Sequence, residues 1–297
     1  MTWIRGKWIR ILFGAAIWVA LIVTVIATWE ETEPELSRAG LLVPLAVLLI
    51  VVGLLAAARG WAALQRSGSR RRSMVGFIAA QPAKYLPVGG ALQAAGQVEL
   101  TTSEGGSKRE VAWTFLIHAG VQVTSALLVA LLLLTDVSTP AWLKLLILVV
   151  ASAACVSLRQ SVVASMVRRL SRLIPRLASR GDLPPTKSLV ESTGWTIVPL
   201  VMSGLSFGLL LGLGDSPGVL VSTAGAFAVS WVVGFLLFPL PSGLGAREAV
   251  LVALIPTFPA AQVLGVSLVH RLATVIAELI LLTAVSKTAF LSRERSG

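Results

Sequence analysis

Long runs of apolar residues, each bounded by charged or helix-breaking residues, organise this chain. A helix needs about 20 predominantly apolar residues to cross the hydrocarbon core of a bilayer. Runs of that length predict membrane-spanning helices at 9–29, 40–58, 111–134, 141–164, 193–213, 218–238 and 261–285. The pattern therefore predicts an all-α fold, a polytopic helical bundle in a membrane.

Two further segments are apolar but broken. The segment 74–100 is interrupted at Pro82 and at Pro87-Val-Gly-Gly90, and the segment 238–256 combines prolines, glycines and the charged Arg247. Irregular backbone at membrane depth is tolerated where it is buried in protein or lines a wet cavity. Two interpretations of the second segment stay open: a polar site inside the membrane, or a cytosolic turn whose arginine anchors at the headgroups.

Composition supports a membrane protein. The 297 residues are 56% hydrophobic and only 13% charged, whereas soluble domains carry roughly 25% charged residues. A net charge of +11 would suggest nucleic acid in a soluble protein, but here the basic residues flank apolar segments. Anionic lipid is therefore the expected partner, and nucleic acid is not. We expect one integral membrane domain over residues 1–297, and a buried, inert thiol at Cys155.

Charge also predicts the orientation. Placing the Lys and Arg clusters in the cytoplasm puts both termini inside the cell membrane, which requires an even number of crossings. The count is eight if 244–256 crosses and 74–100 enters and leaves from the cytoplasmic side. Tryptophans near the predicted span ends fit an aromatic belt: Trp8, Trp29, Trp61, Trp113, Trp142 and Trp195.

Residues 160–180 place apolar side chains at helical spacing, with arginines on the other side. This pattern predicts a basic amphipathic helix on the inner membrane surface. A straight extension of the preceding span into the cytosol is the alternative. The apolar positions are Val163, Met166, Val167, Leu170, Ile174 and Leu177.

The two broken segments resemble one another. Leu86-Pro-Val-Gly-Gly-Ala91 matches Leu240-Pro-Ser-Gly-Leu-Gly-Ala246 apart from one inserted residue, and each has a basic residue nearby. Paired broken segments in two halves of a chain indicate a transport site, and they suggest a pseudo-repeat of two halves. Because Leu, Gly and Ala are abundant in this chain, a chance match is the alternative.

These turns have the chemistry of an anion site. A helix start exposes unpaired N–H groups and a positive dipole end, glycine lets backbone approach a ligand, and arginine offers a fork that matches phosphate. A phospholipid or polyprenyl-phosphate headgroup fits this description. The candidate headgroup-binding residues are Lys84, Pro87, Gly89, Gly90, Gly243, Gly245, Arg247, Glu248, Arg271 and Glu278.

The last span carries two of these charges on one helical face. Arg271 and Glu278 should face protein or water, because a charge at the bilayer centre costs at least ~2.5 kcal/mol. Glu248 is the expected partner of Arg271. A structural ion pair that holds helices together is the alternative role for these groups.

Catalytic chemistry is not indicated. His118 and His270 are the only histidines, and no metal-ligand cluster or nucleophile–base spacing accompanies them. A lone histidine in a span is more often a satisfied packing residue. We therefore expect no catalytic residue, no metal and no cofactor.

Four motifs resemble the lysylphosphatidylglycerol synthase transmembrane, or flippase-like, family, and the resemblance covers nearly the whole chain. It implies a helical bundle with re-entrant segments that moves lipids between leaflets. In some relatives the cargo is an aminoacylated phospholipid; others accompany glycosyltransferases and handle polyprenyl-linked sugars. The motifs are Arg59-Gly-Trp61, Lys84-Tyr-Leu-Pro-Val-Gly-Gly90, Pro239-Leu-Pro-Ser-Gly-Leu-Gly-Ala-Arg-Glu-Ala-Val-Leu-Val-Ala-Leu254 and His270-Arg271-Leu272.

One stretch departs from the family pattern. Members often carry an acidic-basic-acidic cluster at the start of the third span, where this chain has only the polar His118 and Gln122. We expect translocation of an anionic phospholipid or a polyprenyl-phosphate sugar. The alternative is a non-transporting scaffold or regulatory subunit of a partner, such as a membrane glycosyltransferase or a lipid-modifying synthase, and the missing charges favour it.

Overall fold

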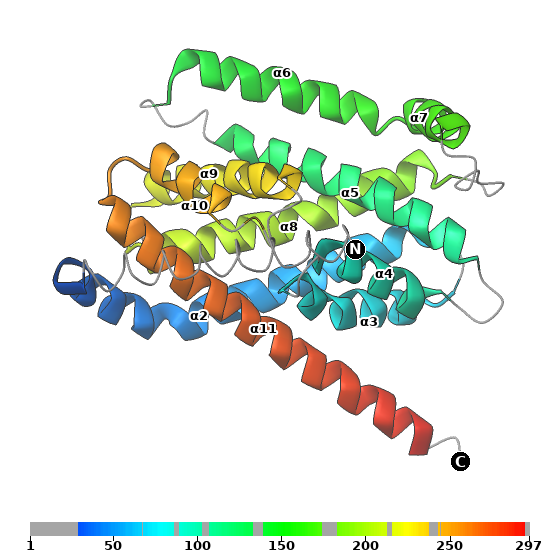
Figure 1. The fold of residues 1–297 in the computed structure, drawn as a ribbon, viewed down its shortest axis with the longest axis horizontal. Coiled ribbons are helices and arrows are strands. Elements are labelled where there is room, and N and C mark those ends of the chain that lie inside the picture. Colours follow the sequence, from blue (N-terminus) through cyan, green and yellow to red (C-terminus); the bar gives the residue numbers. More distant parts are fainter. Residues whose placement is uncertain are drawn as a thin grey trace, which may run out of the picture.

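In the computed structural model, helices account for nearly all of the described backbone (Figure 1). The structure describes residues 29–66, 68–85, 89–102, 107–132, 139–173, 183–212, 216–237, 243 and 245–294. Within them no strand occurs, which confirms the all-α prediction. The helices are α2 (Trp29–Leu64), α3 (Arg70–Ala80), the 3₁₀ turn η1 (Gln81–Tyr85), α4 (Gly89–Thr101), α5 (Lys108–Ala130), α6 (Ala141–Ser157), α7 (Gln160–Leu173), α8 (Thr186–Leu210), α9 (Pro217–Leu236), α10 (Ala246–Leu254) and α11 (Ala260–Glu294).

Five of the described helices are long and apolar enough to cross a membrane, and a bent pair would make a sixth. The bent pair is α6 with α7 up to Arg169, where 141–164 predicted one span. The predicted span 9–29 lies outside the described residues except for Trp29, which begins α2. The five helices are Leu42–Leu64 in α2, α5, α8, α9 and Ala260–Ser286 in α11.

The helix in the second broken segment is short. Helix α10 has nine residues, so it is about 14 Å long at 1.5 Å per residue. That is roughly half of the ~30 Å hydrocarbon core. Helix α10 thus falls short of a crossing by itself, and the total of eight crossings stays a prediction.

The centre of the bundle is the antiparallel contact between α2 and α8. A Cβ on Gly53 would lie 2.9 Å from the backbone of Pro199, and one on Gly60 would lie 2.9 Å from Thr196 Oγ1. The Ser192 hydroxyl donates to the Gly60 carbonyl over 2.8 Å. Small residues let helix backbones approach closely in a membrane, where lipid tails are as apolar as leucine and dispersion contacts must supply the attraction.

The motif Arg59-Gly-Trp61 lies in the contact between α2 and α8. Its tryptophan shows that one prediction, the aromatic belt, was wrong in part. Arg59 lies 5.2 Å from the centroid of the Trp195 ring. The Trp61 side chain is fully buried, and its indole N–H donates to Thr101 Oγ1 over 3.2 Å. Trp113 is buried as well. These two indoles are core residues, so placing them in an aromatic belt was wrong.

The first broken segment forms a helical hairpin. Gly76 on α3 faces Thr101 on α4, and Gly96 on α4 faces Ala80, so the two helices run antiparallel (Figure 1). The hydrogen bond from Trp61 to Thr101 joins the C-terminal end of α4 to α2. The hairpin therefore leaves and returns at the same end of the bundle.

Helices α6 and α7 lie along one side of the bundle (Figure 1). They are bent by 82° to each other, so α7 does not continue α6 as a straight extension. Its Arg168 and Arg169 are exposed, and of the predicted apolar face Val163 and Val167 pack inward. Met166 is exposed, and Ile174 and Leu177 lie outside the described residues. Cys155 is exposed on α6, so the prediction of a buried thiol was wrong: no helix covers that face of α6 within the described part of the chain.

Several basic segments lie at one end of the bundle. Arg66 donates to the Leu183 carbonyl over 3.1 Å, and Arg70 lies 3.8 Å from Glu191. The connections around 65–69 and 183–185 are therefore neighbours, as the positive-inside reasoning requires. The orientation itself stays a prediction.

Candidate functional site

Helices α9 and α10 form a second tight corner. Gly243 and Gly245, which precede α10, have φ of +68° and +82°, a region that only glycine enters readily. A Cβ on Gly234 in α9 would lie 2.4 Å from Cγ of Arg247 and 3.4 Å from Cα of Gly243. The glycines thus allow the chain to turn closely and leave room for the stem of the Arg247 side chain.

The Arg247 side chain has an unusual environment for a cation. Its guanidinium lies 5.0 Å from the centroid of the Phe227 ring, a cation–π contact. Among the described residues it makes no hydrogen bond and no ion pair. Arginine has five N–H donors in a planar fork, so this side chain retains donors for an anion.

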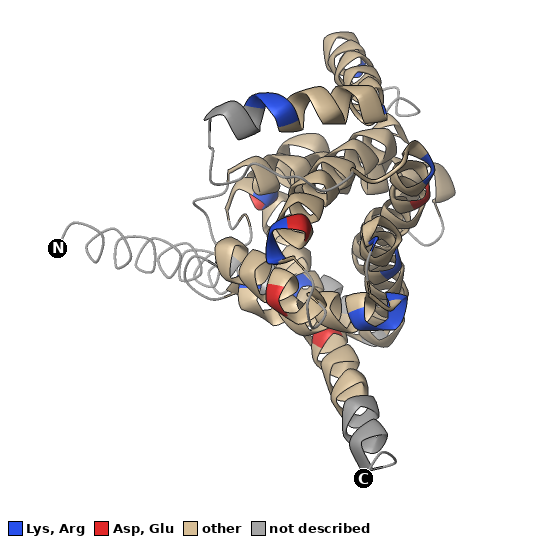
Figure 2. Cartoon of the chain, turned by 90° about the vertical axis from the view of Figure 1, so that its right-hand side faces the viewer, with Lys and Arg blue, Asp and Glu red and all other residues tan. Residues whose placement is uncertain are grey.

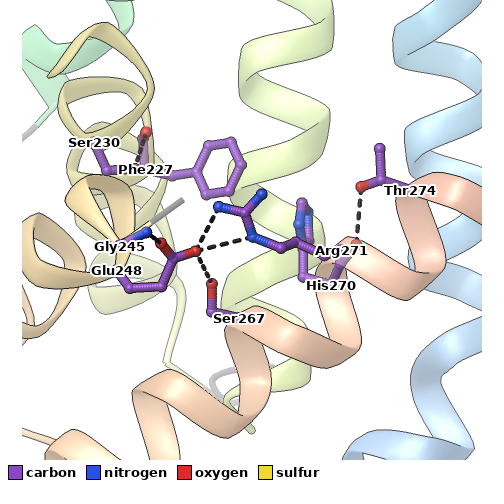
Figure 3. Close-up of polar contacts among 8 residues, drawn as sticks. All are labelled: Phe227, Ser230, Gly245, Glu248, Ser267, His270, Arg271 and Thr274. Carbon is purple, nitrogen blue, oxygen red and sulfur yellow. Dashed lines mark hydrogen bonds and ion pairs between the residues drawn. The ribbon is translucent and has the colours of Figure 1, made fainter. Parts of the chain in front are cut away.

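The neighbouring Glu248 has every oxygen occupied (Figure 3). Oε1 accepts from Arg271 Nε at 2.9 Å, from Arg271 Nη2 at 2.6 Å and from Ser267 Oγ at 3.1 Å. Oε2 accepts from the Gly245 N–H at 2.8 Å, which caps α10. The expected Arg271–Glu248 pair is therefore present, and it joins the turn and α10 to α11.

A second ion pair joins the hairpin to the same helix. The Lys84 ammonium on η1 donates to Oε1 of Glu278 on α11. The lysine side chain is 23% exposed and the carboxylate 2%. The prediction that Arg271 and Glu278 face protein rather than lipid is confirmed, since the arginine side chain is only 11% exposed.

These charges form one cluster. Lys84 interacts electrostatically with Arg247, and Arg247 with Arg271, each pair repelling. Figure 2 shows how sparse charged residues are on the described helices, where most of the ribbon is uncharged. The two broken segments, about 160 residues apart in the chain, thus each form an ion pair with α11: Lys84 of the first with Glu278, and Glu248 of the second with Arg271.

The two histidines differ. His270 lies 3.2 Å from the Ser203 carbonyl and packs edge-on against Phe227 at 5.1 Å. His118 packs against Trp61 and Phe77, but both ring nitrogens are buried without a hydrogen-bond partner. The prediction of a satisfied packing residue holds for His270 and is wrong for His118. No group of three metal-ligating side chains occurs in the part of the chain that the structure describes.

The structure brings most of the predicted site residues together. Lys84, Arg247, Glu248, Arg271 and Glu278 form the charged cluster described above, and Gly243 and Gly245 form the corner before α10. Gly89 and Gly90 open α4, with Gly90 exposed, and Pro87 lies outside the described residues. Whether any of these residues binds a headgroup stays a prediction.

Three residues that contact the charged cluster were not predicted from the sequence. Ser267 precedes Arg271 by one helical turn, so the periodicity of α11 was a usable signal. Gly234 and Phe227 lie on α9, which reads as a uniform apolar span. Their role depends on which helix packs against α9, and no local pattern carries that information.

The chain matches a known protein family. The family model described as the lysylphosphatidylglycerol synthase TM region matches residues 8–281. No curated protein matches the chain.

Proposed function

The chain belongs to the family of the lysylphosphatidylglycerol synthase TM region, and from this premise we propose that it moves an anionic lipid between the leaflets of the cell membrane. The family is a membrane family related to flippase-like function. The proposed cargo is an anionic phospholipid or a polyprenyl-phosphate-linked sugar. The shared feature is a phosphate next to a long apolar tail.

The observation that supports this proposal is the state of Arg247. A buried or half-buried cation is normally paired, because removing it from water costs several kcal/mol. Arg247 is half-buried and has no carboxylate or carbonyl partner among the described residues. A phosphate that docks there would accept two parallel N–H bonds from the guanidinium. Lys84 lies near enough to add a second positive charge.

The fold supports a route for the headgroup. Two hairpin-like segments, α3–α4 and α9–α10, each form an ion pair with α11, through Lys84 and Glu278 and through Glu248 and Arg271. We propose that α3–α4 is a re-entrant segment and that the two broken segments belong to a pseudo-repeat of two halves. We also propose that the whole chain crosses the membrane eight times, with 244–256 as one of the crossings and both termini in the cytoplasm. We further propose that the protein acts by binding and movement rather than by catalysis.

The test is leaflet movement of a fluorescent anionic lipid in proteoliposomes that contain the purified chain. Arg247→Ala should reduce movement to the rate of protein-free vesicles, because the headgroup loses its paired donor. Arg247→Lys should recover only part, since it keeps the charge and loses the fork. The matched control is Arg71→Ala, an exposed arginine at the start of α3, which should move lipid like the wild type. Wild-type rates in Arg247→Ala would refute the proposal.

A second candidate function has one observation in its favour. Two of the three clustered cations, Lys84 and Arg271, already pair with carboxylates, as in a structural network. A scaffold or regulatory subunit of a membrane glycosyltransferase or synthase would need no more than that. Absence of movement for phospholipids and polyprenyl-phosphate sugars alike, together with a tightly co-purifying enzyme, would favour this role.

A further inference from the structure

Glu278 is a buried carboxylate with only one of its oxygens satisfied. Oε1 accepts from the Lys84 ammonium, while Oε2 is buried and has no hydrogen-bond partner among the residues that the structure describes. Buried carboxylates normally have several hydrogen-bond partners, because a charged oxygen that is buried without one keeps the full cost of its lost hydration. The partner of Glu278 is Lys84, whose ammonium also interacts electrostatically with the guanidinium of Arg247.

The surroundings of Glu278 are otherwise poor in charge. The 3₁₀ turn η1 presents the Lys84 ammonium, which pairs with the carboxylate, and the uncharged Tyr85 ring, whose centroid lies 5.2 Å from that ammonium. Arg271 on the same helix already pairs with Glu248 on α10. The neighbouring turns of α11 pack against apolar side chains of α2 and α3, namely Ile50, Val51, Leu54, Met74, Phe77 and Ile78.

Lys84 therefore has two competing anions once a headgroup enters. A phosphate at Arg247 attracts the neighbouring ammonium, and each ammonium–phosphate contact weakens the contact with Glu278. Removing one partner from a buried pair leaves an uncompensated charge, which is strongly unfavourable. The carboxylate escapes this cost by taking up a proton, since a neutral carboxyl group is far less costly in apolar surroundings.

We propose that Glu278 takes up one proton when an anionic headgroup takes Lys84 from it, so that lipid movement and proton movement are coupled. This rests on the proposed function, because the headgroup must bind at Lys84 and Arg247. One O–H bond forms at Oε2, the proton comes from water on the side of entry, and Lys84 remains an ammonium. On the other side the headgroup leaves, Lys84 returns to Glu278 and the proton is released. One negative charge and one proton move together.

The first test uses purified full-length protein in phosphatidylcholine vesicles with a trace of fluorescent phosphatidylglycerol. A gradient of one pH unit is a factor of ten in proton activity, so one-to-one coupling should drive up to about a tenfold excess of the probe into the leaflet on the alkaline side. Glu278→Gln should abolish this accumulation, because the amide cannot exchange a proton. The control Glu99→Gln alters an exposed carboxylate that pairs with Lys108, and it should accumulate the probe like the wild type.

The second test separates the two proposals. Short-chain phosphatidylglycerol is titrated into weakly buffered, detergent-solubilised protein, and proton uptake is measured together with binding. We expect about one proton per bound lipid in the wild type and none in Glu278→Gln.

The possible outcomes distinguish failure of the proton coupling from failure of the anion site. Probe that moves but stays evenly distributed across the gradient overturns the coupling and leaves the proposed function standing. Binding without proton uptake overturns the coupling in the same way. Absence of Arg247-dependent binding overturns the anion site, and the coupling with it.

Discussion

Two buried glutamates, Glu248 and Glu278, differ in how many hydrogen-bond donors their carboxylates have. Glu248 has four donors from three residues: two from Arg271, one from Ser267 and one from the Gly245 N–H (Figure 3). Within the described part of the chain, Glu278 has Lys84 as its one partner, and its second oxygen accepts no hydrogen bond. Both carboxylates are almost completely buried.

The difference separates a structural ion pair from an exchangeable one. A carboxylate with all its hydrogen bonds made loses several contacts together when any partner moves, so the arrangement is rigid. A carboxylate held by one flexible, partly exposed lysine loses a single contact. The Glu248 network therefore fixes the corner that carries Arg247, and the Glu278 pair leaves the hairpin that carries Lys84 free to change partner.

The largest expected effect contrasts the two carboxylates directly. Glu248→Gln should lower the free energy of unfolding by about 3–5 kcal/mol, because it replaces the buried carboxylate that pairs with Arg271 by a neutral amide. Glu278→Gln should cost less than about 1 kcal/mol, since Lys84 is partly exposed and can still donate to the amide oxygen. The check is the thermal unfolding midpoint of each purified variant in the same detergent. Equal shifts would show that the two pairs do not differ in kind.

An intermediate effect is expected at the corner next to Glu248. In Gly234→Ala the new Cβ would lie 2.4 Å and 2.8 Å from Cγ and Cδ of Arg247. The arginine side chain must move, at a cost of about 1–3 kcal/mol, and binding of short-chain phosphatidylglycerol should weaken with it.

The matched control is Gly120→Ala, where a Cβ meets nothing within 4 Å. That change should gain about 0.5–1 kcal/mol from helix propensity and leave binding as it was. Unaltered binding in Gly234→Ala would contradict the role of this glycine in placing Arg247.

The smallest effect tests a single donor of Glu248. Ser267→Ala removes the 3.1 Å bond to Oε1 and should cost about 0.5–1.5 kcal/mol. The control is Ser286→Ala on the same helix, whose exposed hydroxyl bonds only to the Leu282 carbonyl among the described contacts, with an expected change within about 0.5 kcal/mol. Indistinguishable unfolding midpoints for the two variants would mean that Ser267 contributes nothing to the network.

Much of the fold was predictable because its causes are local. Apolar runs of spanning length, prolines and charged ends predicted five described helices that qualify as spans, the hairpin at 74–100 and the bend into α7. The failures share a different cause. Trp61 and Trp113 sit near helix ends yet are buried, and Cys155 lies in an apolar run yet is exposed. Which face of a helix meets another helix cannot be read from the helix alone.

The candidate site was likewise predictable only where its features are local in the sequence. Two cation–glycine turns and the charged face of the last span were visible in the sequence, and so was the pairing of Arg271 with Glu248. The partner of Lys84 was not, because Glu278 is 194 residues away. Phe227 and Gly234 carried no signal in an apolar helix, since their importance comes from the side chain of Arg247 that packs against them.

The sequence by itself determined that this protein is a helical membrane protein, where its helices break and which charges lie at membrane depth. Those features follow from backbone hydrogen bonding and from the cost of burying charge, and each acts within a few residues along the chain. Only the tertiary structure decided which charge is satisfied, which is shared and which is left open. Partner choice depends on side chains brought together from distant helices, and the difference between Glu248 with four donors and Glu278 with one strong partner exists only once α10, α11 and the α3–α4 hairpin have packed.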